Sequence, residues 1–194
     1  MSTLLTIGHS NHSFEHFLDL LDRSGVEVVV DVRSYPASKF APQFNREPLG
    51  AALTSKRIKY LFLGHELGGR PDGEECYDDK DHVLYGKVAE SELFRSGLER
   101  LRDGLDQYRV AIMCSEEDPS GCHRRLLVSR VLADEGVAID HVRGDGRIES
   151  EQELSVREGT AHVQVTLFGE GEADVWRSIR SVSRRRARES SSIS

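Results

Sequence analysis

Two cysteines, a histidine, an acid and an arginine lie close together in one segment of this sequence. The segment runs from Cys114 to Arg124 and also contains Glu116, Cys122 and His123. A cysteine can act as a nucleophile or redox group, a histidine and a carboxylate can move a proton, and an arginine can bind an anion. The segment therefore predicts a reactive site without identifying the reaction.

The position of Cys122 favours an activated thiol. It precedes a helix predicted over residues 123–135, where backbone N–H groups and the helix dipole stabilise a thiolate. His123 and Arg124 add positive charge beside it. We therefore expect the pKa of Cys122 to lie below that of an ordinary thiol. The alternative is that Cys122 and Cys114 are buried core residues, as free cysteines often are.

The spacing of the two cysteines, Cys-x₇-Cys-His, differs from the patterns of structural zinc sites. The sequence therefore predicts no metal ion, although a mixed site that also includes His9 or His65 is left open. It names no cofactor.

The elements around this segment alternate between strands and helices. Apolar, β-branched runs predict strands at residues 3–7, 26–32, 58–63, 110–114 and 137–142. Helical spacing of apolar residues occurs in the segments between them, at residues 14–24, 48–53, 84–107 and 123–135. This alternation predicts an α/β fold, a three-layer Rossmann-like domain with a mainly parallel five-stranded sheet.

Composition divides the chain of 194 residues into three parts. We expect an α/β domain over residues 1–145, a polar extension over 146–175 and a disordered tail rich in Arg and Ser over 176–194. The formal net charge is −7, which disfavours non-specific binding of nucleic acid by the whole chain. The tail carries six arginines against one glutamate and is able to bind nucleic acid locally.

Several features favour a cytoplasmic protein with no membrane partner. No apolar run is long enough to span a membrane, and the N-terminus lacks the basic and apolar regions of a signal peptide. Three cysteines, an odd number, do not form a disulfide framework, so we expect reduced thiols.

Polar residues follow each predicted strand. Because the carboxyl ends of parallel strands meet at one edge of a sheet, we expect these side chains to converge there, where open α/β sheets bind their ligands. They are His9 and Ser10 after the first strand, Asp31 and Arg33 after the second, His65 and Arg70 after the third, Cys114 and Glu116 after the fourth, and Arg143 after the fifth.

Two known reactions of catalytic cysteines, sulfur transfer and phosphate-ester hydrolysis, do not match the pattern of residues at this edge. Asp31-Val-Arg33 after a strand is similar to the rhodanese sulfurtransferases, and those enzymes and the cysteine phosphatases place a loop ending in arginine after the cysteine. Here no arginine follows Cys114 before Arg124, and a helix follows Cys122 at once. Sulfur transfer and phosphate-ester hydrolysis are therefore disfavoured.

Five motifs occur in order within about residues 4–143. They are Thr6-Ile-Gly-His-Ser10, Asp31-Val-Arg33-Ser-Tyr-Pro36, Pro42-Gln-Phe-Asn45, Glu66-Leu-Gly-Gly-Arg70, and Cys114-x-Glu116-x-x-Pro119-x-x-Cys122-His-Arg124. Together they resemble the Domain of Unknown Function 488 family. The resemblance implies no settled reaction. It implies that the matching residues are signature positions, namely His9, Ser10, Asp31, Arg33, Gln43, Glu116, Cys122, His123 and Arg124.

Anion recognition is the function that these residues favour. Helix starts near Ser13 and Cys122 offer backbone N–H groups, and the aromatic residues of loop 34–45 are able to stack on a base. We therefore predict a protein that binds a small anionic, nucleotide-like ligand and acts on it. The predicted catalytic residues are His9, Asp31, Glu116, Cys122 and His123. The predicted ligand-binding residues are Ser10, Arg33, Gln43, Arg70, Cys114 and Arg124, with Arg33 and Arg124 facing the ligand.

The competing interpretation is a non-enzymatic accessory protein. Such a protein would associate with nucleic acid through the basic tail, and its domain would sense a ligand.

Overall fold

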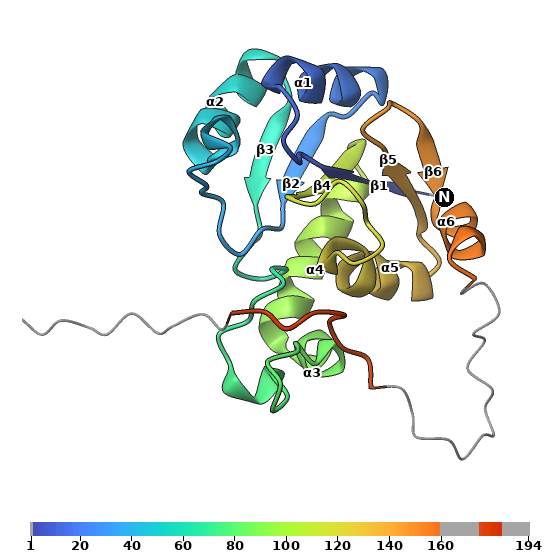
Figure 1. The fold of residues 1–194 in the computed structure, drawn as a ribbon. Coiled ribbons are helices and arrows are strands. Elements are labelled where there is room, and N and C mark those ends of the chain that lie inside the picture. The colour runs from blue at the N-terminus through green and yellow to red at the C-terminus, as the bar shows by residue number, and fades with distance from the viewer. Residues whose placement is uncertain (1, 160–174, 184–194) are drawn as a thin grey trace, which may run out of the picture.

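The computed structural model of the protein describes residues 2–159 and 175–183. These residues form one six-stranded sheet with strand order β3-β2-β4-β1-β5-β6 (Figure 1). The first five strands are parallel, and β6 is antiparallel to β5. The strands are β1 (Thr3–Gly8), β2 (Val28–Asp31), β3 (Lys59–Phe62), β4 (Val110–Cys114), β5 (Ala138–Val142) and β6 (Ile148–Ser150).

Helices cover both faces of this sheet (Figure 1). Side chains alternate along β1, so Leu5 packs with α1 and α2 on one face, whereas Leu4 packs with α4 and α5 on the other. This arrangement confirms the predicted three-layer α/β fold. The helices are α1 (Phe14–Arg23), α2 (Arg46–Ser55), α3 (Tyr85–Glu90), α4 (Glu92–Leu105), α5 (Arg130–Asp134) and α6 (Glu151–Arg157), with short turns η1 (Pro42–Phe44), η2 (Glu74–Cys76) and η3 (Arg124–Ser129). Within the described ranges, no helix has both the length and the apolar character needed to cross a membrane.

Two of the predicted helices have a different form in the structure. The helix predicted over 84–107 is interrupted at Ser91, whose side chain accepts a hydrogen bond from the Phe94 N–H and so begins α4 as a new helix. The helix predicted over 123–135 opens with the π-helical turn η3, in which the Ser129 hydroxyl donates to the Arg124 carbonyl. Such turns are frequent at functional sites.

The segment after residue 145 continues the domain. β6 pairs with β5, and α6 follows it behind the capping box of Ser150 and Glu153. The predicted extension over 146–175 is therefore partly integral to the sheet, which gains a sixth strand. The rest of that extension lies outside the described residues.

Residues 175–183 form a strap that packs beside α3 (red in Figure 1). Its backbone exchanges hydrogen bonds with residues 81–85, and the Trp176 indole N–H donates to the Leu126 carbonyl at 2.8 Å. The structure thus differs from the disordered tail predicted from residue 176, because the single tryptophan anchors the strap on the domain. Residues 184–194 of that tail lie outside the described part of the chain.

The chain leaves neighbouring strands β1 and β4 in opposite directions. After β1 it runs to α1 on one face of the sheet, and after β4 it runs to η3 and α5 on the other. Gly8 and Cys114 are register partners at this divergence. A Cβ atom on Gly8 would lie 1.7 Å from the Glu116 carbonyl oxygen, so only glycine lets the loop after β4 cross here. Open α/β sheets bind ligands at such a switch point.

Candidate functional site

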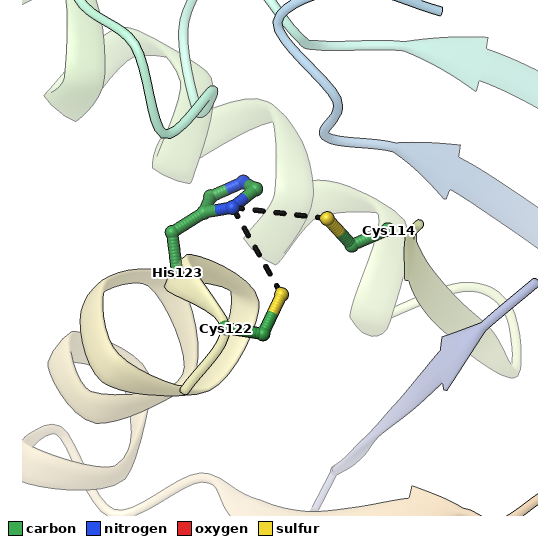
Figure 2. A group of neighbouring side chains, drawn as sticks. All are labelled: Cys114, Cys122 and His123. Carbon is green, nitrogen blue, oxygen red and sulfur yellow. Dashed lines mark hydrogen bonds between the residues drawn. The ribbon is translucent and has the colours of Figure 1, made fainter. Parts of the chain in front are cut away.

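Cys114, Cys122 and His123 form a cluster at the end of β4 (Figure 2). The Nδ1 atom of His123 lies 3.8 Å from the Cys114 sulfur and 4.0 Å from the Cys122 sulfur. Both sulfurs point toward the imidazole ring (Figure 2). The other ring nitrogen, Nε2, donates to the Val32 carbonyl at 2.9 Å. This bond assigns the proton of neutral His123 to Nε2, which leaves the Nδ1 lone pair directed at the two sulfurs.

The loop between the two cysteines is folded back onto Arg124. The Arg124 guanidinium, which is completely buried, donates to the carbonyls of Glu116 and Glu117 and to the Thr6 hydroxyl. The Cys122 N–H donates to the Pro119 carbonyl at 3.0 Å, which turns the chain into η3. These bonds bring Cys122 beside Cys114, although eight positions separate them in the sequence.

Their surroundings shift the pKa values of the two thiols in opposite directions. A hydrogen bond from Cys122 lowers the pKa of Cys114 against the effect of burial, and the positive charge of Arg124 adds to this. Burial and then the hydrogen bond to Cys114 raise the pKa of Cys122 well above its usual range. The prediction that Cys122 is the acidic thiol is therefore wrong. Its side chain is only 2% exposed, and this burial outweighs its place at a helix start.

The pKa of His123 depends on burial, on Cys122 and on the backbone of Val32. Burial lowers its pKa, but hydrogen bonding to Cys122 and to the Val32 carbonyl outweighs burial and raises the pKa above the usual value. Contacts at both ring nitrogens therefore hold the imidazole, the two sulfurs at Nδ1 and the Val32 carbonyl at Nε2.

Asp31 and Arg33 pair with each other inside the fold. The guanidinium makes two hydrogen bonds to the carboxylate, of 2.9 and 2.7 Å, and the pair is almost fully buried. The Tyr60 hydroxyl also donates to Asp31, and Arg33 also donates to the Phe44 carbonyl. The sequence predicts that Arg33 faces an anionic ligand, and this residue does line the pocket described below. Its guanidinium is nevertheless paired with the buried carboxylate of Asp31.

His9 completes this buried network. Its Nδ1–H donates to the Ser10 carbonyl at 2.8 Å, its Nε2 accepts from Arg33 at 3.1 Å, and its ring stacks on Phe44 with centroids 4.4 Å apart. Both ring nitrogens are therefore occupied, so the geometry favours a positioning role over the predicted catalytic one.

We expect His9 to remain neutral down to about pH 4. Burial lowers its pKa to about 4 from an ordinary value of 6.5. The unfolded chain takes up this proton below pH 6.5 and the folded protein does not, so stability should fall as the pH drops from 6.5 toward 4. The loss from this group is about 3 kcal/mol at most. Histidine NMR resonances followed against pH measure the pKa, and a midpoint near 6.5 would contradict the prediction. In His9→Asn, the stability should depend less on pH over this range.

A pocket of about 590 Å³ opens above the cluster. Five parts of the fold line it, namely the loop after β2, the Gly69–Arg70 turn, Tyr85 at the start of α3, the segment from Cys114 to His123, and the strap. Arg70 and Arg180 both line this pocket and are exposed, and the structure gives neither an ion pair within the described ranges. The ring of Tyr35 also lines it, with the Arg70 guanidinium 5.5 Å from its centre.

Some predicted site residues do not line this pocket. Gln43 donates to the His12 carbonyl, and Ser10 hydrogen-bonds Asn11. His65 lies at the carboxyl edge, as predicted, but its ring packs against Phe62. Of the aromatic residues in the 34–45 loop, Phe44 is buried in the core and Phe40 is exposed to solvent.

Sequence reasoning missed Arg180 and Tyr85. Arg180 lies on the strap, and Tyr85 is buried beside Cys122, Glu116 and Cys114, which raise its pKa in addition to the effect of burial. A lone tryptophan, Trp176, in an otherwise polar tail was the signal that the strap docks on the domain.

A larger cavity of about 1060 Å³ lies between η3, α5 and α6. Arg125, one of its charged lining residues, is already paired with Glu151 and Glu158, and the cavity shares Glu116 and Arg180 with the smaller pocket. This cavity contains neither cysteine of the cluster nor His123, so the smaller pocket is the better candidate site.

Comparison with known proteins places the chain in a family. Residues 13–131 match the sequence model of the family described as Domain of unknown function DUF488. The chain belongs to the DUF488 family. The match confirms the resemblance seen in the motifs and includes four of the five, while Thr6–Ser10 precede its first residue. No curated protein matches the chain.

Proposed function

We propose that this DUF488 protein binds a small anionic, nucleotide-like ligand in the carboxyl-edge pocket and acts on it through the cysteine–histidine cluster. The observation that carries the proposal is the placement of two arginines, neither of them in an ion pair among the described residues, over a cluster of two thiols and an imidazole. Both features meet at the switch point of an open α/β sheet, where such proteins bind their ligands.

The charge of the pocket supports an anion. Arg70 and Arg180 lie on different segments and present guanidinium groups, which suit the geometry of a phosphate or carboxylate. The chain as a whole carries a net charge of −7, so a cationic pocket is a local feature. Tyr35 supplies an aromatic surface, 46% exposed, on which a base can stack.

The floor of the pocket supports a reaction. Cys114 and His123 line it together with Glu116, so a nucleophile, an imidazole and an acidic residue border the same space. Glu116 and His123 thus keep their predicted roles within this proposal.

Replacing Arg70 or Arg180 with methionine should weaken binding of phosphate or a nucleoside monophosphate about 10- to 150-fold each, the range for lost hydrogen bonds to charged groups. Both side chains are exposed, so the stability of the ligand-free protein should change little. Titration calorimetry of the full chain measures both affinities. Arg95→Met on α4 is the matched control, an exposed arginine far from the pocket lining, and should bind like the wild type. Equal affinity of all three variants would refute the proposal.

The proposal also includes a cytoplasmic location and a role for the basic tail. A cytoplasmic location is supported by the three cysteines, all of which are free thiols. Attachment to nucleic acid through the basic tail stays a prediction, because residues 184–194 lie outside the described ranges. Two arginines of that tail lie against the domain: Arg177 forms an ion pair with Asp78, and Arg180 lines the pocket.

A further inference from the structure

We propose that Cys114, Cys122 and His123 bind a zinc ion and leave its fourth coordination position open to the carboxyl-edge pocket. The proposal reverses the prediction from spacing, because the folded loop brings together residues whose sequence pattern matches no structural zinc site. It deepens the proposed function, and only the use of the open position rests on that function.

The distances in the cluster are close to those of a tetrahedral zinc site. With Zn–S of about 2.3 Å and Zn–N of about 2.0–2.1 Å, a tetrahedral site needs about 3.6 Å between sulfur and nitrogen and about 3.8 Å between two sulfurs. The structure has 3.8 and 4.0 Å from the His123 Nδ1 to the two sulfurs, and all three ligand atoms lie within 4.8 Å of one another. The two sulfur–nitrogen distances therefore need to shorten by a few tenths of an ångström, and the two sulfurs are within reach of one ion.

The histidine is held as a metal ligand is held. Ligating histidines almost always donate their second ring N–H to a carboxylate, carbonyl or water, which fixes the tautomer and aims the free lone pair at the metal. The bond from His123 Nε2 to the Val32 carbonyl does this, and Val32 directly follows β2 in the core. The other ring nitrogen, Nδ1, lies within reach of both sulfurs, as the dashed lines show (Figure 2).

The chemical types of the three ligands favour zinc over other metal ions. Two thiolates and one imidazole are soft and intermediate ligands that suit zinc, whereas magnesium and calcium prefer oxygen. Two thiolate charges neutralise a divalent ion, so the complex can lie at a site where both cysteines are at most 7% exposed. Three protein ligands with an open fourth position are typical of catalytic rather than structural zinc.

The open position faces the proposed ligand. Cys114, Cys122 and His123 all line the pocket that contains Arg70 and Arg180. An anion held by these arginines can therefore place an oxygen on the zinc, or meet a water bound to it. Glu116 lines the same pocket.

A disulfide between Cys114 and Cys122 is the competing use of the two thiols. It would leave unexplained why the imidazole is fixed at similar distances from both sulfurs. The test therefore follows the metal and the oxidation state of the thiols together.

The experiment is cobalt titration of the full chain after chelation and full reduction. We expect one Co²⁺ per chain, with the thiolate charge-transfer and strong visible bands of a tetrahedral site, and displacement of the cobalt by Zn²⁺. Cys114→Ser, Cys122→Ser and His123→Ala should each weaken zinc binding about 100-fold or more, beyond the loss for an outer-shell partner. Cys76→Ala is the matched control, because Cys76 is a buried thiol in η2, outside the cluster, and it should bind like the wild type.

A second measurement needs no variant. Zinc should protect Cys114 and Cys122 of the wild type from alkylation and leave the rate at Cys76 unchanged, as read by peptide mass spectrometry. Reduced protein that shows no cobalt bands, or protection that includes Cys76 equally, would overturn the zinc site. So would a Cys114–Cys122 disulfide in protein that takes up no metal after reduction.

The two proposals can fail separately. Zinc binding is measured without any anion, and phosphate binding is measured in metal-free protein with the Arg70 and Arg180 variants. Zinc uptake without phosphate binding would overturn only the proposed function, and phosphate binding without zinc uptake would overturn only the metal site.

Discussion

Replacing Arg33 with methionine should destabilise the protein by about 3–5 kcal/mol, the range for breaking a buried ion pair from one side. The variant leaves the Asp31 carboxylate completely buried, with only the Tyr60 hydroxyl and the Arg33 backbone N–H still donating to it. The Phe44 carbonyl and the Nε2 of His9 lose a donor as well. Urea unfolding of the variant against the wild type measures the loss.

The double variant Asp31→Asn, Arg33→Met separates charge from packing. It removes both members of the pair, so it should recover part of the stability lost by Arg33→Met alone. The deficit should also be the same with and without phosphate. A variant that keeps its stability but loses phosphate binding would instead give Arg33 the ligand-binding role predicted from the sequence.

Replacing Arg124 with methionine should cost about 2–4 kcal/mol and should also weaken the metal site. The change leaves the part-buried carbonyls of Glu116 and Glu117 without this donor, and a buried acceptor left unsatisfied costs about 1–3 kcal/mol. These carbonyls belong to the loop that holds Cys122 beside Cys114. Urea unfolding measures the first effect, and cobalt titration of the folded variant measures the second.

Arg124→Lys is the informative companion of this variant. The ammonium group keeps the charge but cannot span two carbonyls and the Thr6 hydroxyl, as the planar guanidinium does. We expect it to recover only part of the lost stability. Full recovery by lysine would show that the charge of Arg124 matters more than its hydrogen bonds. Wild-type stability in Arg124→Met would refute the structural role.

Local patterns in the sequence were sufficient for the order of the five parallel strands. The predicted strand 110–114 coincides with β4, and the helix after Ser13 begins where its side chain caps it. The convergence of residues after the strands was also predictable, since His9 N–H donates to the Cys114 carbonyl and Asp31 ends β2 beside β4. Parallel pairing decides these positions, because it needs only the strand boundaries and their common direction.

The direction of each polar side chain was not predictable in this way. Arg33 and Arg124 occupy the positions of ligand-binding residues at the carboxyl edge, yet both guanidinium groups turn inward to partners distant in sequence, such as Phe44 for Arg33 and Thr6 for Arg124. A buried charge must find its hydrogen bonds wherever the fold offers them, and sequence spacing does not contain that information.

The sequence by itself determined the α/β class, the family and the edge of the sheet that carries the candidate site, because periodicity and motifs are local properties. The tertiary structure decided the cluster of Cys114, Cys122 and His123, since the 115–121 loop closes on a buried guanidinium. It also decided that Arg180 lines the pocket, since Trp176 anchors the strap against the domain. These outcomes depend on contacts between residues far apart in the chain, and burial then reverses the acidity that the local position of Cys122 predicts.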